Sequence, residues 1–254
     1  METLQVLRAD GVVTVTLDRP EKKNAVNRTM WSELLAVLDE VAAETSDRVL
    51  VLTGAGGEFC SGADLSDADD THQLQKMRAI GDVALRLHRL AKPTLAKVRG
   101  VAVGAGCNLA LGCDLVVASE DARFSQIFAQ RGLSIDFGGS WVLPRLVGLH
   151  KAKELALFAD ILSATQVHEL GLLNRVVPDD QLDDVVDGWA ARLAAGPPLA
   201  LSMTKTMLNN AFAVSMEQAV EDEARCQAVN ATSADAVEAV TAFLQKRRPH
   251  FEGR

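Results

Sequence analysis

Two glycine-containing turns are the first places in this sequence where chemistry can be expected. They span residues 54–63 and 104–106, and the second follows a β-branched run over residues 98–103 and opens a small-residue helical pattern. A strand that turns directly into a helix leaves backbone N–H groups unpaired at the helix start, where the helix dipole favours negative charge. Gly104 and Gly106 also lack the Cβ atoms that would obstruct a close ligand. The second turn is therefore typical of an anion site, although a nucleotide-binding turn or a tight packing turn has the same pattern.

Both turns follow predicted strands, and this determines where they should lie. A parallel sheet binds ligands beyond the carboxyl ends of its strands, so we expect the two turns to face one crevice. The backbone N–H groups of Ala63 and Ala105 would then form an oxyanion hole. One such donor, aimed at developing charge, lowers a barrier by roughly 2.7–4 kcal/mol. The arrangement suits a thioester or ester carbonyl that passes through an enolate or a tetrahedral anion.

The composition excludes several classes of function. Hydrophobic residues make up 48% of the 254 residues and charged residues 24%, which is typical of a globular protein with a sizeable core. The net charge is -8 and no dense Lys/Arg tract occurs before residues 246–248, so we expect no nucleic-acid partner. No apolar run reaches membrane-spanning length and residues 1–11 do not resemble a targeting peptide, which predicts a cytoplasmic protein without membrane association. The cysteines lack metal-site spacing, so we expect no metal and four free thiols: Cys60, Cys107, Cys113 and Cys226.

The elements that position the two turns alternate between strands and helices. This alternation predicts β-α-β units with right-handed crossovers. An acidic segment that ends at Asp70 precedes the second helix. The expected elements are a hairpin over residues 4–17, a helix over 29–44, a strand over 48–53, a helix over 72–90, and strands over 98–103 and 115–118.

From Ser140 onward the pattern is helical almost throughout. Ser163 and Gln166 have the spacing of a capping box, and residues 174–177 predict one more short strand. After a Gly-Pro-Pro sequence, three helices are expected over residues 199–211, 216–229 and 234–246. The chain is therefore divided into an α/β core, residues 1–196, and a C-terminal helical region, residues 197–254.

A set of motifs runs along nearly the whole chain. They are Asp18-Arg19-Pro20 with Asn24-Ala25-Val26, GAGGEFCSGADL at 54–65, KVRGVAVGAGCNLALGCDLVVAS at 97–119, ARFSQ at 122–126 and GLSIDFGGSWVLPRLVG at 132–148. In order and spacing they resemble the crotonase superfamily, the enoyl-CoA hydratase/isomerase family. The resemblance implies an α/β fold of crotonase-like stacked β-α-β units with a C-terminal helical trimerisation region. It also implies an acyl-CoA substrate and a role in fatty acid metabolism such as β-oxidation. Coenzyme A would be part of the substrate, and no separate cofactor is expected.

The same resemblance assigns roles to individual residues. Ala63 and Ala105 would supply the oxyanion hole. Phe243 and Lys246 match C-terminal residues that reach the CoA of a neighbouring subunit, in a homotrimer that usually pairs into a hexamer. The CoA channel would be lined by Ala25, Val26, Gly62, Asp64 and Leu65.

The sequence departs from the family pattern at the acid–base positions. Family hydratases carry two glutamates, but here the corresponding residues are Asn108 and Phe128, neither of which exchanges a proton at neutral pH. Asp136 stands where hydratases usually have glycine. Some isomerases of the superfamily place a catalytic aspartate there, and aryl-CoA dehalogenases place a nucleophilic one. Apolar neighbours raise a carboxyl pKa toward the value that a general base needs, and here they are Leu133, Ile135, Phe137 and Trp141.

Each of these residues also has a structural interpretation. Asp136 precedes Gly-Gly-Ser, so a helix N-cap is its less favoured interpretation. Asn108 either packs in its turn or hydrogen-bonds the substrate, and Asp64 is expected to be structural. Phe128 is expected in the wall of the acyl pocket or in the core, and residues 66–90 and Trp141 are expected to build that pocket. His72 and His88 are expected on solvated faces, and Cys60, Cys107 and Cys113 as small buried hydrophobes.

Together these residues favour an enoyl-CoA double-bond isomerase with Asp136 as the base. Shifting a double bond needs one base that returns the same proton, whereas hydration also needs a positioned water. A hydratase that holds water with Asp136 and Asn108 is the first alternative, and a non-catalytic acyl-CoA-binding paralogue is the second. A nucleotide site is disfavoured because Leu109 replaces the third glycine of the G-x-G-x-x-G pattern and no suitable acidic residue follows.

Overall fold

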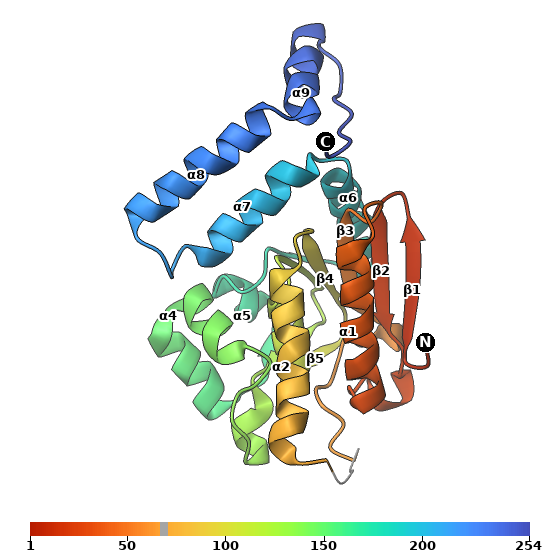
Figure 1. Cartoon of the computed structure of the whole chain (residues 1–254). Helices are drawn as coiled ribbons and strands as arrows, with labels where there is room; N and C mark the ends of the chain where they lie inside the picture. The colour runs from red at the N-terminus through yellow and green to blue at the C-terminus, as the bar shows by residue number, and fades with distance from the viewer. Residues whose placement is uncertain (67–70) are drawn as a thin grey trace.

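The computed structural model describes residues 1–66 and 71–254. Residues 67–70, at the end of the predicted acidic segment, lie outside the described residues. Within the described residues the elements form two sheets with helices on both faces of the larger one (Figure 1).

The larger sheet has the order β1-β2-β3-β4-β6-β9. Its first pair is the predicted antiparallel hairpin, and every later pair is parallel. This confirms the β-α-β units expected from the strand–helix alternation. The strands are β1 (Leu4–Ala9), β2 (Val12–Leu17), β3 (Val49–Gly54), β4 (Thr94–Val98), β6 (Leu115–Ser119) and β9 (Arg175–Val177). A second sheet, with the order β5-β7-β8, contains β5 (Val101–Val103), β7 (Arg123–Ser125) and β8 (Leu162–Ser163).

The single strand predicted over residues 98–103 is wrong, because the chain breaks between β4 and β5 and passes from one sheet to the other. Gly100 forms the break with a φ of +55°, and a Cβ there would lie 2.1 Å from Glu58 Oε2. The same carboxylate accepts the N–H of Val101 at 2.6 Å. The contact with Glu58 stabilises this turn, and the turn directs β5 toward the following helix.

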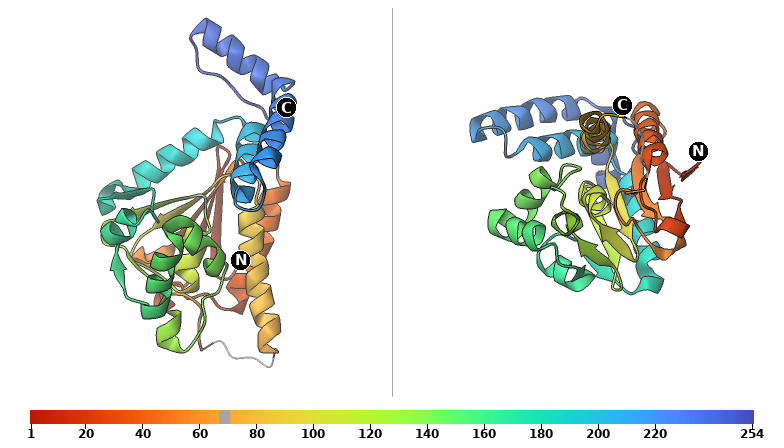
Figure 2. Two further views of the ribbon diagram at one scale, coloured as in Figure 1. Left: turned by 90° about the vertical axis from the view of Figure 1, so that its left-hand side faces the viewer. Right: turned by 90° about the horizontal axis from the view of Figure 1, so that it is seen from below.

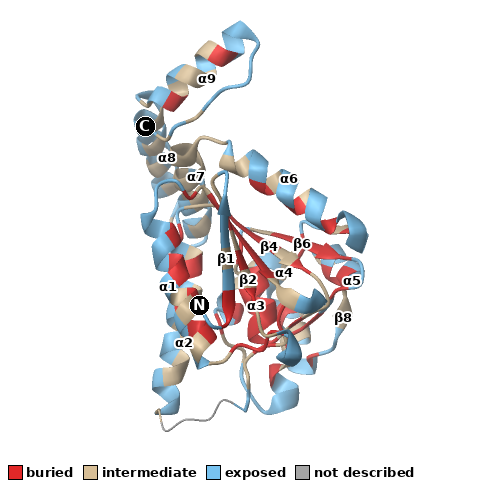
Figure 3. Ribbon diagram, turned by 90° about the vertical axis from the view of Figure 1, so that its right-hand side faces the viewer, coloured by how far each residue is buried: buried red, intermediate tan, exposed pale blue. Residues whose placement is uncertain are grey.

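The helices pack against the sheet in two layers (Figure 3). Side chains alternate between the faces of a strand, so Leu50 and Leu52 face the larger core while Val49 and Val51 face the smaller one. The larger core is closed by α1 (Arg28–Ala43), α2 (Gln73–Arg89), α3 (Ala105–Leu111) and α4 (Gly139–Phe158), and the smaller one by α6 (Leu182–Ala194). The short α5 (Ala164–Glu169) begins with the predicted capping box, in which both reciprocal hydrogen bonds of Ser163 and Gln166 are present.

The last three helices lie at one end of the molecule, where α7 is bonded to the core and α8 and α9 extend away from it (Figures 1 and 2). They are α7 (Pro198–Asn210), α8 (Met216–Ala231) and α9 (Ala234–Gln245), which confirms the predicted C-terminal helices within two residues at each end. Several large apolar side chains on α8 and α9 are exposed: Met216, Val220, Val229, Val237, Val240, Phe243 and Leu244. Among the helices of the described residues, none is both long and apolar enough to cross a membrane.

Candidate active site

The two turns singled out in the sequence lie against each other. The loop that follows β3 pairs with β5, because Cys60 N–H donates to Val101 O at 2.8 Å and Val103 N–H donates to Cys60 O at 3.0 Å. Gly62 has a φ of +102°, and a Cβ there would lie 3.0 Å from Val103 O and 3.9 Å from Ala105 N. The loop therefore reaches the first residue of α3, and only glycine allows this approach.

The backbone of Ala63 offers an unused donor at this junction. Val26 N–H donates to Gly62 O at 2.8 Å, and Asp64 N–H donates to Val26 O at 2.9 Å. Ala63 lies between these two bonds, in a parallel bridge with Val26. No acceptor for its own N–H occurs among residues 1–66 and 71–254. An anion bound in the crevice can therefore accept a hydrogen bond from the Ala63 N–H.

Ala105 offers the second donor because it is the first residue of α3, where an N–H has no partner within the helix. Gly104 caps the helix with φ 57° and ψ −126°, and its own N–H donates to Ser125 O at 2.9 Å. A Cβ on Gly104 would lie 3.8 Å from Phe128 Cζ. The buried ring of Phe128 therefore borders the turn, where a pocket wall was predicted.

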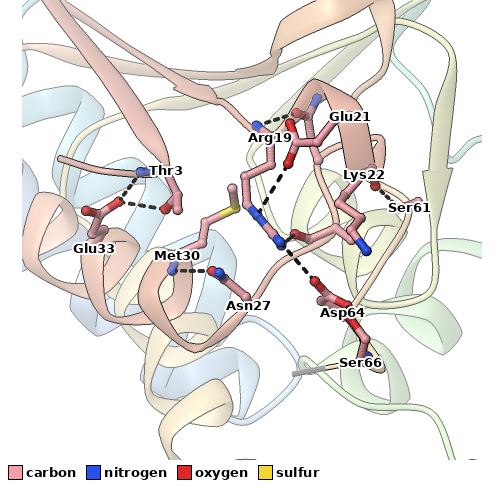
Figure 4. Close-up of polar contacts among 12 residues, drawn as sticks. Thr3, Arg19, Glu21, Lys22, Asn27, Met30, Glu33, Ser61, Asp64 and Ser66 are labelled. Atoms are coloured by element: carbon pink, nitrogen blue, oxygen red, sulfur yellow. Dashed lines mark hydrogen bonds and ion pairs between the residues drawn. The ribbon is translucent and has the colours of Figure 1, made fainter. Parts of the chain in front are cut away.

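Arg19 joins two segments of the predicted CoA channel (Figure 4). Its guanidinium donates to Ala25 O at 2.6 Å and to Asp64 Oδ2 at 3.0 Å. The other oxygen of Asp64 accepts from Ser66 Oγ at 2.6 Å and Ser66 N at 3.0 Å. The Ser66 hydroxyl and then Arg19 lower the pKa of Asp64 to about 2. Asp64 thus has the structural role expected, while Leu65 is exposed beside it. Arg19 appeared in the sequence only as part of a motif.

Asp136 lies in the turn before α4. The helix begins at Gly139 with Gly138 as its N-cap and has no side-chain cap, so the N-cap interpretation of Asp136 is wrong. Its Oδ1 atom is buried and has no hydrogen-bond partner among the described residues. Burial raises the pKa of this carboxyl to about 6, and no charged neighbour contributes to the shift. An unpaired carboxylate with a pKa near 6 suits general-base catalysis.

Asn108 is held by the protein at both ends of its amide. Its side chain is 2% exposed on the first turn of α3. Nδ2 donates to the backbone oxygen of Asp136 at 2.9 Å, and Oδ1 accepts from Gln126 Nε2 at 2.8 Å. Of the two interpretations left open by the sequence, these contacts favour packing within the turn over a bond to the substrate.

Trp141 lies on α4 beside two charged or titratable side chains. Its ring meets His88 of α2 edge-on at 5.0 Å between centroids, and the Arg145 guanidinium lies 3.8 Å from the Trp141 ring centroid. The solvated face predicted for His88 is wrong, because the ring is half-buried and burial lowers its pKa. Trp141 itself is 40% exposed. The predicted pocket elements, α2 and Trp141, are therefore in contact.

Phe243 and Lys246 lie far from the other predicted site residues of the same chain. They are at the end of α9, which extends away from the core, whereas α2, the first helix after Leu65, packs on the larger core (Figures 1 and 2). Phe243 is 81% exposed. The structure therefore does not bring these two residues together with the other predicted site residues of the same chain.

Three buried thiols, Cys60, Cys107 and Cys113, are poor nucleophiles. Burial raises the pKa of Cys60, Cys107 and Cys113 to about 12, so these thiols stay protonated. Within the part of the chain that the structure describes, no group of three His, Cys, Asp or Glu side chains is placed to hold a metal ion.

Comparison with known proteins places this geometry in a family. The family model for enoyl-CoA hydratase/isomerase matches residues 8–254. The 1,2-epoxyphenylacetyl-CoA isomerase of Escherichia coli is 40% identical over 96% of each chain, and the 2,3-dehydroadipyl-CoA hydratase of the same organism is 36% identical over the full length of both. A crystal structure of an enoyl-CoA hydratase from Bacillus anthracis superposes with a TM-score of 0.94, at 30% identity over 99% of this chain and 100% of that one.

Proposed function

Because the chain belongs to the enoyl-CoA hydratase/isomerase family and has its crotonase fold, we propose that it shifts a double bond in an enoyl-CoA thioester with Asp136 as the base. The observation that carries the proposal is the Asp136 carboxyl, whose Oδ1 is buried without a partner among the described residues and whose pKa is raised to about 6. A base is effective when its pKa lies near the working pH.

The two backbone donors complete the chemistry. Asp136 removes a proton from C2 of a 3-enoyl thioester, and the electron pair moves into the thioester carbonyl as an enolate. The N–H groups of Ala63 and Ala105 donate to the enolate oxygen. The double bond then moves from C3–C4 to C2–C3 as Asp136 returns the proton to C4. The carboxyl ends the cycle ionised, as it began.

Hydration is the less favoured activity for this site. Adding water across a double bond requires a held water as well as a proton donor, and family hydratases use two glutamates for this. Asn108 accepts from Gln126 and donates to the Asp136 backbone, so little of its amide remains for a water. The names of the relatives include both an isomerase and a hydratase, and so do not decide between them.

Several copies of the chain are proposed to assemble into a homotrimer, or a pair of trimers. The exposed apolar side chains of α8 and α9 need cover, and Phe243 and Lys246 are at the end of α9, which extends away from the core (Figure 1). A neighbouring copy would bring the same two residues to the predicted CoA channel. Light scattering at micromolar concentration should give the mass of three or six chains, and a monomer alone would contradict the assembly.

The deciding experiment uses a panel of 3-enoyl-, 2-enoyl- and dienoyl-CoA thioesters in deuterated water. Products are analysed for mass and for double-bond position. Deuterium incorporation with a moved double bond and no added water supports the isomerase. A gain of one water supports the hydratase, and saturable binding without turnover supports a protein that only binds acyl-CoA.

A further inference from the structure

The turn that carries Asp136 has an unusual backbone. Phe137, directly after Asp136, has a φ of +48°, a conformation that bulky residues rarely adopt. Such a conformation costs of order 1–3 kcal/mol and persists only where the surroundings impose it. Gly138 follows with a φ of +75°. Two consecutive left-handed residues turn the chain sharply between Asp136 and α4.

Two contacts hold this turn against the core. The ring of Phe137 stacks on Trp31 of α1, with 5.3 Å between centroids and an angle of 28° between planes. On the other side, Asn108 Nδ2 and Gly139 N both donate to the backbone oxygen of Asp136 at 2.9 Å. A Cβ on Gly139 would lie 2.3 Å from Asn108 Nδ2, so glycine allows the amide to approach this closely.

Gln126 and the Asp136 carbonyl bond opposite ends of the Asn108 amide. Gln126 Nε2 is a donor and bonds Asn108 Oδ1 at 2.8 Å, which leaves Asn108 Nδ2 directed at the Asp136 carbonyl. Both side chains are nearly fully buried, at 2% for Asn108 and 4% for Gln126. A carboxylate at position 108 could accept from Gln126 but could not donate to Asp136 O.

We propose that Asn108 and Gln126 are positioning residues, whose hydrogen-bonded pair holds the Asp136 turn so that its carboxylate stays buried and unpaired next to the Ala105 donor. Asn108 and Ala105 are three residues apart on the first turn of α3, so the pair fixes the base to the helix that presents one oxyanion donor. The inference rests on the proposed function, because it assumes that Asp136 is the base. It assigns neither Asn108 nor Gln126 a contact with the reacting atoms.

The test follows the acid limb of the rate–pH profile, since a buried base has a raised pKa and a solvated one does not. The probe is a six-carbon 3-enoyl-CoA thioester, and the readouts are isomerisation and proton exchange into deuterated solvent. The variants are Asn108→Ala, which removes the donor, and Gln126→Met, which keeps the length of the side chain but frees the Asn108 amide to rotate. Cys113→Ala, at a buried residue just after the end of α3, controls for a general loss of packing.

In the Asn108→Ala variant, kcat should fall about tenfold or more, because a solvated carboxylate is a weaker base. The pKa of the acid limb should move from about 6 toward the ordinary value of about 4, with KM changed by less than about threefold. Gln126→Met should shift the limb in the same direction by less. Cys113→Ala should lower the melting temperature and leave both the limb and kcat in place.

An Asn108→Ala protein that folds and keeps the pKa of the acid limb overturns the inference, whether or not kcat falls. If Asn108→Ala does not fold, Gln126→Met decides alone, and an unshifted limb in that variant is contrary to the proposal. The proposed function fails separately, because its failure appears as turnover retained in Asp136→Asn. If Asp136→Asn has no turnover and the acid limb of Asn108→Ala is not shifted, the proposed isomerase activity stands and only the positioning role is overturned.

Discussion

Two aspartates near the candidate site have opposite surroundings. Asp64 accepts hydrogen bonds on both oxygens, from Arg19 on one and Ser66 on the other, and its pKa falls to about 2. Asp136 has a buried Oδ1 without a partner among the described residues, and its pKa rises to about 6. Asp64 directly follows the Ala63 donor, and the Asp136 turn is bonded to α3, which begins with the Ala105 donor, through Asn108.

The contrast separates a carboxylate that maintains structure from one that is available for chemistry. Hydrogen bonds to the charged form stabilise it and make it a poor base, whereas burial without partners destabilises the charged form and makes it a better one. At Asp136 the hydrogen bonds from Asn108 and Gly139 go to the backbone oxygen, and none is made to the buried Oδ1 of the carboxylate among the described residues. At Asp64 the hydrogen bonds from Arg19 and Ser66 go to the carboxylate itself.

The largest expected effect is on catalysis in Asp136→Asn. The variant keeps the size of the side chain but cannot accept a proton, so isomerisation and proton exchange should fall about 10²–10⁴-fold. The matched variant Asp64→Asn should instead raise KM for acyl-CoA and keep kcat within a few-fold. Steady-state kinetics and exchange into deuterated solvent measure both. Turnover of Asp136→Asn within a few-fold of wild type would remove Asp136 as the base.

Ala105→Pro tests the backbone donor at the start of α3. Proline removes the N–H yet suits the first position of a helix, so the fold should survive. The loss of one oxyanion donor corresponds to about 10²–10³ in kcat. Ala105→Gly keeps the N–H and should retain the rate within a few-fold. Circular dichroism must show both variants folded, and a normal rate in Ala105→Pro would contradict the assignment.

Much of the fold followed from periodicity in the sequence. Continuous apolar runs and amphipathic patterns predicted the ends of β3, α1 and α2 within two residues, because the hydrophobic periodicity of each element is contained in its own sequence. The break at Gly100 was not predictable in this way. A β-branched run is compatible with one strand, and the turn depends on Glu58, whose carboxylate accepts the Val101 N–H across 43 residues of sequence.

In the candidate site, too, local features were predictable and long-range contacts were not. The backbone donors were predictable because glycine turns after strands have a local signature. The surroundings of Asn108 and Asp136 were not, because the contacts cross 18 and 28 residues of sequence. Arg19 had no local signal for its contact with Asp64, 45 residues on. A polar residue inside an apolar helix, as at Asn108, is the one sign that a buried partner was needed.

A smaller effect is expected when Arg19, the charged partner of Asp64, is removed. In Arg19→Ala the link between Ala25 and Asp64 is lost, and KM for acyl-CoA should rise about tenfold, which corresponds to about 1.4 kcal/mol of binding. The rate kcat should stay within about threefold, because Asp136 is untouched. Glu21→Ala is the matched control, since this exposed carboxylate is also paired with Arg19, at 4.0 Å, and its KM should not change. A KM equal to that of wild type in Arg19→Ala would show that the link is not needed for CoA binding.

The smallest expected effect is a difference in stability, and its sign is opposite at the two aspartates. The folded-state pKa of Asp136 is raised, so its favourable contribution is complete below about pH 4 and is lost as the pH rises through about 6. The side chain retains some solvent contact, which reduces the cost at neutral pH to about 1–2 kcal/mol. Asp136→Asn removes a charge that folding disfavours, and should therefore stabilise the protein at pH 7.5 and hardly at all at pH 4.

Asp64 should behave in the reverse way. Its folded-state pKa is lowered, so its contribution is present above about pH 4 and is lost as the pH falls through about 2. Asp64→Asn should destabilise the protein by about 1 kcal/mol at pH 7.5 and by nearly as much at pH 4, because hydrogen bonds to a charged group are removed. Urea denaturation of wild type and both variants at the two pH values measures this. If the difference in stability between Asp136→Asn and wild type is the same at pH 7.5 as at pH 4, the pKa of the Asp136 carboxyl is not raised by folding. The proposed contrast between the two aspartates would then be wrong.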